Sequence, residues 1–373
     1  MTFWKSSRLL GIAAVGVLAL AGCGSDDNTT NTGSGGTDGA SSSASAATID
    51  CQPGTLNGEG SSAQKNAIDQ VIQQGYQSQC SDATINYNAT GSGSGRKQFT
   101  SGQADWAGSD SALKEEEKAA ATARCENNPA WNLPMVAGPI AIAYNLEGVD
   151  GLVLNADVAA KIFSGAITTW NDPAIAALNP DATLPSTAIS VFFRTGTSGT
   201  TENFTKYLHA AAPEAWTAEG NQEWAGKGEG REGSAGVAQA VAGAAGGITY
   251  VEWSYAQDND LSVAQIDTGS GAVELTGESA GKTVATATQT GEGNDLSLKI
   301  DYATKEAGAY PIVLVTYEIV CSKGLDAEKT ALLKSFLTYF SEDETQAGLQ
   351  EIGYAPLPAE VSEKVRTAIA AIA

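Results

Sequence analysis

Three glycine-rich segments with serine or threonine residues each precede or open a predicted helix, and together they could bind an anion. They are Gly58–Ser62, Thr90–Gly95 and Arg194–Thr200. The N-terminus of a helix exposes unpaired N–H groups and the positive end of the helix dipole. Glycine lets the backbone come close to a ligand, and hydroxyl groups add donors. One such segment is more often a helix cap or a turn, but three of them, one led by an arginine, predict an oxyanion site.

Two charged residues would complete this site. Arg194 follows two phenylalanines, which favours a partly buried guanidinium group that needs an anionic partner, although an arginine at a strand end can also lie on the surface. A buried carboxylate at Asp110 could accept a hydrogen bond only from a ligand that carries a proton. Phosphate carries one near neutral pH and sulfate does not, so Asp110 would reject sulfate. The alternative role of Asp110 is the N-cap of a helix over 111–123.

Short apolar strands alternate with helical segments along the chain, which indicates an α/β fold. Two apolar strands, Met135–Leu146 and Pro311–Val320, are unusually long. They would either carry the chain between two lobes or lie in the core of one large sheet. The span Thr268–Asn294 lacks clear periodicity and predicts a surface loop. The other predicted strands are Thr84–Tyr87, Ile189–Phe193 and Ile248–Trp253, and the predicted helices are Ser61–Gln74, Asp157–Phe163, Ala327–Phe340, Glu344–Ile352 and Ala359–Ile372.

The N-terminal 22 residues are typical of a signal peptide. Lys5 and Arg8 precede an apolar run over 9–20, which is too short to span a membrane. The run ends in Leu-Ala-Gly before Cys23, which resembles a bacterial lipobox and predicts cleavage before a lipid-modified cysteine. An ordinary secretory signal is the alternative. Residues 23–48 are mostly small and polar and predict a disordered tether. We therefore expect an exported protein held on the outer face of the cell membrane by Cys23.

The remaining residues are enough for two lobes with separate cores. The net charge of the chain is −22, which excludes nucleic acid as a partner because nucleic-acid binding depends on basic side chains. The chain has one histidine and no cysteine spacing typical of zinc, so we expect no metal and no cofactor. Besides Cys23 there are four cysteines, which allow three disulfide pairings in an exported protein. We favour Cys51–Cys80, because these residues bracket one strand–helix unit, and Cys125–Cys321 then follows.

The three segments resemble those of the phosphate-binding proteins of the Pst transport system. The same is true of the stretches 105–110, 161–165, 169–173 and 178–180, and the resemblance runs in order from about residue 54 to 370. It implies a two-lobe, hinged periplasmic-binding-protein-like fold of type II, with the ligand between the lobes. Lobe I would comprise 49–140 and 316–373, and lobe II 141–315. The implied phosphate-binding residues are Ser61, Ser62, Ala63, Ser92, Asp110, Arg194, Ser198, Gly199 and Thr200.

We expect a monomer that performs no catalysis, and the resemblance implies that it delivers inorganic phosphate to the permease subunits of an ABC importer. Ala63 replaces a frequent aromatic residue and keeps its backbone donor. Gly196 stands where the family often has an acidic residue that holds the arginine, so another carboxylate or the ligand itself would have to orient Arg194.

Three alternative functions remain open at this point. The site could bind another tetrahedral oxyanion, or it could bind phosphate to signal rather than to transport. A surface phosphatase or other hydrolase could use Ser198 as nucleophile and His209 as base. The segment around Ser198 lacks the last glycine of a nucleophile elbow, and His209 lies on the helix that leads away from that serine.

The lipid anchor can be tested by replacing one residue. Cys23→Ala removes the thiol that would carry the lipid, so the protein should move from the membrane fraction to the soluble exported fraction. Fractionation of cells expressing either form measures this, and continued retention of the variant in membranes would contradict the anchor.

Overall fold

The computed structural model describes residues 49–373. The predicted signal peptide (1–22), the lipidation site Cys23 and the tether (23–48) lie outside the described residues. Within 49–373, no helix is long and apolar enough to cross a membrane.

One nine-stranded sheet organises the described residues, in the order β2-β1-β3-β14-β4-β8-β6-β7, with β9 also on β4. The first three strands are parallel to one another, and so are β8, β6 and β7, whereas β14 and β4 run antiparallel to their neighbours. The strands of this sheet are β1 (Gly54–Gly60), β2 (Ala83–Asn88), β3 (Trp106–Ser109), β4 (Ala130–Asn145), β6 (Ser190–Arg194), β7 (Glu229–Arg231), β8 (Gly247–Glu252), β9 (Ser262–Val263) and β14 (Val313–Cys321). Two smaller sheets contain β5 (Val153–Asn155), β10 (Gln265–Asp267) and β11 (Ala272–Val273), and β12 (Thr288–Gln289) with β13 (Leu298–Lys299).

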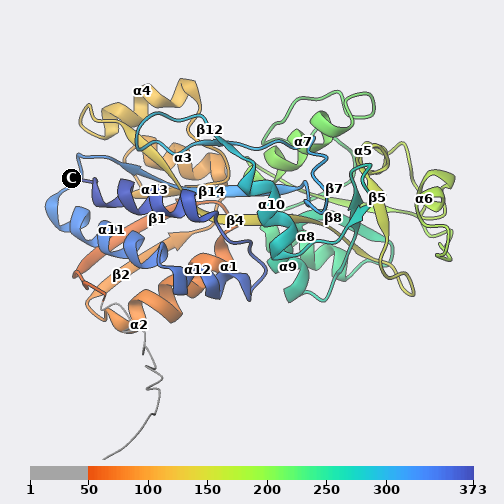
Figure 1. The fold of residues 1–373 in the computed structure, drawn as a ribbon, viewed down its shortest axis with the longest axis horizontal. Coiled ribbons are helices and arrows are strands. Elements are labelled where there is room, and N and C mark those ends of the chain that lie inside the picture. The colour runs from red at the N-terminus through yellow and green to blue at the C-terminus, as the bar shows by residue number, and fades with distance from the viewer. Residues whose placement is uncertain (1–48) are drawn as a thin grey trace, which may run out of the picture. The chain divides into compact units, whose positions relative to one another are not determined.

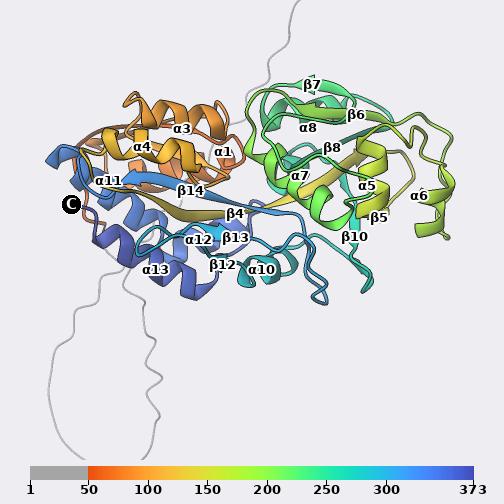
Figure 2. The same cartoon turned by 90° about the horizontal axis from the view of Figure 1, so that it is seen from above.

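Strand β4 belongs to both halves of this sheet. Its residues 130–139 pair with β14, and its residues 140–145 pair with β8. Figures 1 and 2 show β4 running from the group of elements around α3, α4 and α11 to the group around α5, α7 and α8, with β14 beside its first half. The fold is therefore a two-lobe α/β fold of the periplasmic-binding-protein type, in which β4 is continuous through both halves of the sheet.

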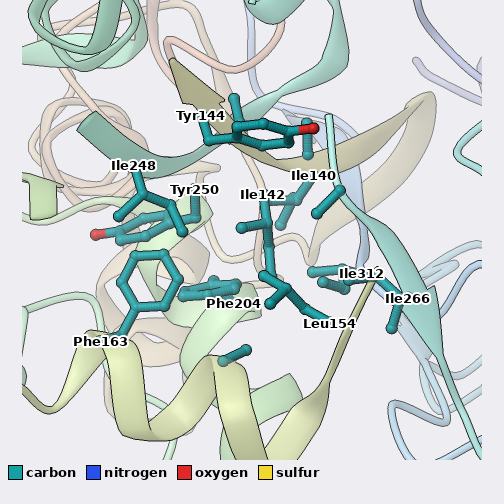
Figure 3. Close-up of a cluster of buried hydrophobic side chains, with 14 of the residues drawn as sticks. Ile140, Ile142, Tyr144, Leu154, Phe163, Phe204, Ile248, Tyr250, Ile266 and Ile312 are labelled. Atoms are coloured by element: carbon teal, nitrogen blue, oxygen red, sulfur yellow. The ribbon is translucent and has the colours of Figure 1, made fainter. Parts of the chain in front are cut away.

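Helices cover the sheet, and the central strands β4, β8 and β14 are buried at nearly every position, so both faces of the sheet are covered there. The helices are α1 (Lys65–Asp69), the π-helix η1 (Gln70–Tyr76), α2 (Gln77–Gln79), α3 (Ser92–Thr100), α4 (Glu115–Arg124), α5 (Ala156–Phe163), α6 (Pro173–Leu178), α7 (Gly199–Ala211), α8 (Gly233–Ala242), α9 (Trp253–Asp258), α10 (Gly277–Ala285), α11 (Ala327–Phe340), α12 (Asp343–Gln350) and α13 (Ala359–Ala370). One core cluster lies around the second half of β4, where Phe163 and Phe204 face Tyr250 (Figure 3). Another joins β1, β2 and the first half of β4 to α11 and α13.

The expectation of a surface loop over Thr268–Asn294 is wrong, because this span contains helix α10. The helix begins with a capping box, in which Thr276 and Ser279 each accept a hydrogen bond from the other's backbone N–H. Ala280 and Val284 of this helix are buried. Two apolar side chains four residues apart are enough to anchor a short helix on a sheet, but they are too few to produce a clear periodic pattern in the sequence.

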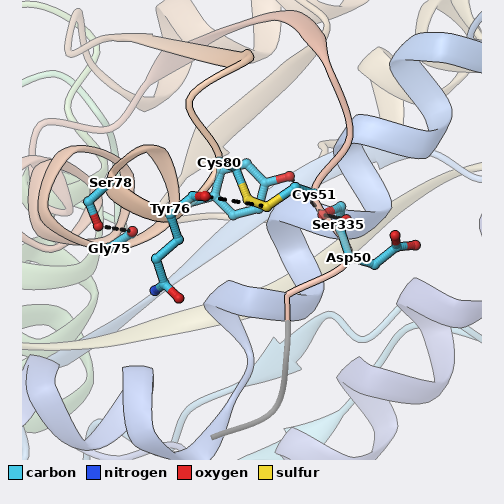
Figure 4. Close-up of a disulfide and its surroundings, with 8 residues drawn as sticks. Asp50, Cys51, Gly75, Tyr76, Ser78, Cys80 and Ser335 are labelled. Atoms are coloured by element: carbon cyan, nitrogen blue, oxygen red, sulfur yellow. Dashed lines mark hydrogen bonds between the residues drawn. A yellow bond between two sulfur atoms is a disulfide. The ribbon is translucent and has the colours of Figure 1, made fainter.

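The structure joins the four cysteines of the described residues in the two favoured pairs. Cys51–Cys80 links the chain ahead of β1 to the turn ahead of β2, beside Tyr76 (Figure 4). Tyr76 forms a hydrogen bond with Ser335 on α11. Cys125–Cys321 links the end of α4 to the end of β14, 196 residues later. The first disulfide closes a local unit, whereas the second fastens two distant parts of the chain.

The two disulfides should differ in what they contribute to stability. In the chain-entropy treatment a loop of 196 residues restricts the unfolded chain more than one of 29, by about 1–2 kcal/mol. Replacing Cys125 and Cys321 by Ala should therefore lower the free energy of unfolding more than the same change at Cys51 and Cys80. Urea unfolding of the two double variants measures this, and equal losses would contradict it.

Candidate functional site

The carboxylate of Asp110 lies at the centre of a buried set of hydroxyl groups. Its Oδ1 accepts hydrogen bonds from Ser61 Oγ at 2.6 Å and Thr316 Oγ1 at 2.7 Å, and its Oδ2 accepts one from Ser92 Oγ at 2.9 Å. These donors come from the end of β1, the middle of β14 and the start of α3. Asp110 follows β3 and does not cap a helix, since α4 begins at Glu115 with Lys114 as its N-cap residue.

Burial raises the pKa of Asp110 from 3.8 to about 6. The three hydroxyl donors stabilise the charged form and oppose this shift, while the negative charge of Glu252 adds to it. The carboxyl group is therefore mostly ionised at neutral pH and takes up a proton in mildly acidic solution.

Arg194, at the end of β6, is only 4 % exposed. Its Nη1 donates to Thr200 Oγ1 at 3.1 Å and to Ser234 Oγ at 2.9 Å. Its backbone N–H donates to the hydroxyl of Tyr250, which stacks on Phe204 in the core below (Figure 3). The Nε atom is buried without a hydrogen-bond partner among the described residues. A buried guanidinium group with an unused donor is suited to binding an anion.

Two helix N-termini meet at this carboxylate. Helix α3 begins at Ser92 and helix α7 at Gly199, with Ser198 as the N-cap residue, whose Oγ accepts from Thr201 N. In the structure described here, the backbone N–H groups of Ser92, Gly199 and Thr200 donate to no backbone or side-chain acceptor. These first-turn groups are free to donate to an anion placed between the helices.

The contact at Gly199 is so close that no side chain fits there. A Cβ atom on Gly199 would lie 2.4 Å from Ser92 Oγ and 2.5 Å from Asp110 Oδ2. Similarly, a Cβ atom on Gly93 would lie 2.6 Å from Thr197 Oγ1. The glycines therefore allow the predicted segments 90–95 and 194–200 to come into contact, although they are about 100 positions apart in the sequence.

Hydrogen bonds also join the two lobes around this site. Asn203 Nδ2 on α7 donates to the backbone oxygen of Asp110 at 2.8 Å. Ser62 Oγ lies 3.0 Å from Ser234 Oγ, and Ser111 Oγ donates to Glu202 Oε2 at 3.0 Å. The lobes are therefore closed on each other in this structure, and the site lies where they meet.

Comparisons with known proteins agree with this architecture. Residues 38–344 match the family described as PBP superfamily domain. Phosphate-binding protein PstS 3 of Mycobacterium tuberculosis is 46 % identical over 370 residues, which cover 98 % of each chain. Phosphate-binding protein PstS 2 of the same organism is 42 % identical over 380 residues, which cover both chains completely. The chain belongs to the PstS family within the PBP superfamily.

Solved structures support the fold of this PstS-family chain at lower sequence identity. A high-affinity periplasmic phosphate-binding protein, PfluDING, determined with phosphate bound, has a TM-score of 0.68 at 22 % identity and covers 84 % of this chain and 93 % of its own. A putative phosphate ABC transporter substrate-binding protein from Clostridium perfringens has a TM-score of 0.60 at 19 % identity, with 82 % and 100 % covered.

The structure brings the nine predicted ligand-binding residues of this PstS-family chain to one place, but it gives some of them different tasks. The N–H of Ala63 donates to Ser61 Oγ, and the N–H of Ser198 donates to backbone oxygens. Ser61 and Ser92 direct their hydroxyl protons at Asp110. Donors that remain for a ligand are thus mostly backbone N–H groups and Arg194.

Three residues at this site were not found from the sequence. Ser234 opens helix α8 after a glycine with φ +67°, so the pattern that marked the other segments is present here as well. Glu252 ends the apolar strand β8, and an acidic residue in such a strand is itself a sign of a buried polar contact. Thr316 has no sequence signal, because a threonine inside a strand is common.

Within 49–373, no group of three or more His, Cys, Asp or Glu side chains could hold a metal ion. His209 lies with its Nδ1 atom 3.3 Å from the backbone oxygen of Trp216 and not beside Ser198. The described residues thus contain no serine–histidine pair of the kind that a hydrolase would need at Ser198.

The raised pKa of Asp110 predicts how the unliganded protein responds to pH. A carboxyl group whose pKa is higher in the folded state binds its proton more tightly there, so ionisation destabilises the fold as pH rises through about 6. The stability of the wild type minus that of Asp110→Asn should therefore fall by on the order of 2–3 kcal/mol between pH 4 and pH 7. Denaturant unfolding in anion-poor buffer measures this difference, and a constant or rising value would contradict the shift.

Proposed function

We propose that this protein binds inorganic phosphate between its two lobes and delivers it to an ABC importer. The observation that carries the proposal is the placement of the Asp110 carboxylate against the N-terminus of α7, the helix whose Thr200 accepts a hydrogen bond from Arg194, a residue with an unused guanidinium donor. The helix N-termini and the arginine supply donors for an oxyanion, and the carboxylate supplies an acceptor. A ligand that needs both is an oxyanion that still carries a proton. The names of the relatives, which are phosphate-binding proteins, support the same ligand.

The ligand would be bound by closure of the lobes and released by their opening. Ser61, Ser62, Ser92 and Asp110 would belong to lobe I, and Arg194 through Thr200 to lobe II. We propose that lobe I comprises 49–140 and 316–373 and lobe II 141–315, so that the chain passes between them on β4 and β14. Only the closed form offers both halves of the site, and phosphate would therefore stabilise it.

We further propose that the protein performs no catalysis, acts as a monomer and is held to the membrane by a lipid on Cys23. The absence of catalysis is supported by the position of His209, away from Ser198. A tethered receptor would stay close to the permease that it supplies. The permease would recognise the closed lobes, since their relative position is what phosphate changes.

Calorimetry with phosphate and sulfate tests the ligand and the role of Asp110 together. At pH 7.5 the wild type should bind phosphate at least about 100-fold more tightly than sulfate, because sulfate would leave Asp110 facing an oxygen without a proton between them. In Asp110→Asn the amide can donate, so this ratio should fall to about tenfold or less. At pH 5 sulfate should bind the wild type more tightly than at pH 7.5, since Asp110 is then mostly protonated.

Asp105→Asn is the matched control for this experiment. Asp105 is also buried and lies five residues earlier, but its carboxylate accepts from Asn57 N and Lys329 Nζ, outside the site. This variant should keep the phosphate-to-sulfate ratio of the wild type. Absence of phosphate binding to the wild type would contradict the proposed function, equal binding of sulfate at pH 7.5 would contradict the role of Asp110, and turnover of phosphate esters would contradict a pure binding role.

A further inference from the structure

No acidic residue close to Arg194 in the sequence forms a hydrogen bond with its guanidinium group in the described residues. Gly196, two residues later, has φ +75°, and a Cβ atom there would have no neighbour within 4 Å. The described residues place no carboxylate in direct hydrogen-bond contact with the guanidinium group, whose Nη1 contacts two hydroxyl groups instead. A buried cation held only by neutral hydroxyls is costly unless a negative charge lies close behind them.

Glu252 supplies that negative charge. It is the last residue of β8, is 1 % exposed, and lies opposite Ile140 of β4, where β4 changes its partner strand from β14 to β8. Its Oε1 accepts a hydrogen bond of 2.5 Å from Thr200 Oγ1. Although Glu252 is the N-cap residue of α9, its side chain makes no capping hydrogen bond, and its Oε2 is buried without a partner among the described residues. Local helix structure therefore does not explain this carboxylate.

Thr200 links the two charges. A hydroxyl group has one proton to donate, and the proton of Thr200 is directed at Glu252. Its oxygen is then left to accept from Arg194 Nη1 at 3.1 Å. The two hydrogen bonds therefore run in the same direction. The Arg194 guanidinium group donates to the Thr200 hydroxyl, and that hydroxyl donates to the Glu252 carboxylate. Because both ends are charged, each of the two hydrogen bonds is stronger than one between neutral groups.

We infer that Glu252 is a positioning residue of the proposed phosphate site, and that it holds the Arg194 guanidinium group in place through the Thr200 hydroxyl. The inference depends on the proposed function for its ligand, but the geometry that it describes exists without one. Thr200 offers an anion its backbone N–H and not its hydroxyl. Ser234 holds the same Nη1 atom from the start of α8, so the guanidinium plane is fixed from two sides while Nε stays available.

The effect of Glu252 on phosphate binding has two parts with opposite signs. As a negative charge near an anion, Glu252 would weaken binding through space. As the anchor of Thr200 and Arg194, it would strengthen binding by keeping the donor aligned. A double-mutant cycle separates the two, because Thr200→Val removes the hydroxyl, keeps the backbone N–H and leaves the charge of Glu252 in place.

We expect Glu252→Gln and Thr200→Val each to weaken phosphate binding by about tenfold, the size of one charge-assisted hydrogen bond. In the Thr200→Val background, Glu252→Gln should cause no further loss and should leave affinity unchanged or slightly higher. Isothermal titration of the full chain with inorganic phosphate measures all four forms. Additive losses, or tighter binding in the single Glu252→Gln variant, would overturn the inference.

Glu318→Gln is the matched control for a buried acid. Glu318 is fully buried on β14 and forms no hydrogen bond with Arg194 or Thr200. Burial raises the pKa of Glu318 well above the usual range of a glutamate, which favours its neutral form and reduces the charge that the substitution removes. Phosphate affinity should be unchanged in this variant, and a tenfold loss there would mean that any buried acid disturbs the site.

Side-chain nitrogen NMR of Arg194 in the phosphate-free protein gives a readout that needs no ligand. With the guanidinium group held by Thr200 and Ser234, its two Nη atoms should give separate signals in the wild type and exchange-averaged ones in Glu252→Gln. Averaged signals in the wild type would overturn the inference. Separate signals in a wild type that does not bind phosphate would instead leave the positioning intact and contradict the proposed function.

Discussion

The burial of the Asp110 carboxylate is the constraint on which the rest of the site depends. An ionised carboxylate removed from water must be surrounded by donors, and here the donors come from three elements, β1, α3 and β14. Those hydrogen bonds fix the end of β1 and the start of α3 relative to the sheet. The same carboxylate also leaves no room for a side chain at Gly199, so only a glycine backbone of the facing segment fits against it. One buried charge therefore limits the residues that the facing segment can use, and in the proposed function it would also set the selectivity of the site.

Much of the fold could be predicted because each element has a strong local signal. Helix α11 over Ala327–Phe340 and strand β14 were expected close to their observed bounds, and β4 was expected except for its first five residues, since long apolar runs and helical periodicity depend on few neighbours. Helix α10 was missed because only two of its side chains anchor it. The anion segments were found because glycine next to serine at a helix start has a direct physical meaning.

The contacts inside the site could not be predicted from the sequence in the same way. The acceptor oxygen toward which each hydroxyl directs its proton depends on angles that the whole sheet sets. Thr200 was expected among the donors to the ligand, yet its hydroxyl faces Glu252. Glu252 itself is separated from Arg194 by 58 positions, and only the neighbouring positions of β6 and β8 in the sheet bring them together. The predicted ligand set and lobe boundaries remain predictions for experiment.

The charges of the site explain how a chain with a net charge of −22 can present an anion site. Arg194 brings one positive charge, while Asp110 and Glu252 bring two negative ones when ionised. The buried Arg96 next to Asp110 is paired with Glu117, so the formal charge of these groups alone would repel an anion. The attraction must come from oriented dipoles: the N-termini of α3 and α7 and the free N–H groups of their first turns. Such dipoles act over short distances in a buried site, whereas the charge of the distant surface is screened by salt within about 10 Å. In the proposed site, selectivity would then rest on Asp110, and affinity would rest on backbone donors and the Arg194 guanidinium group.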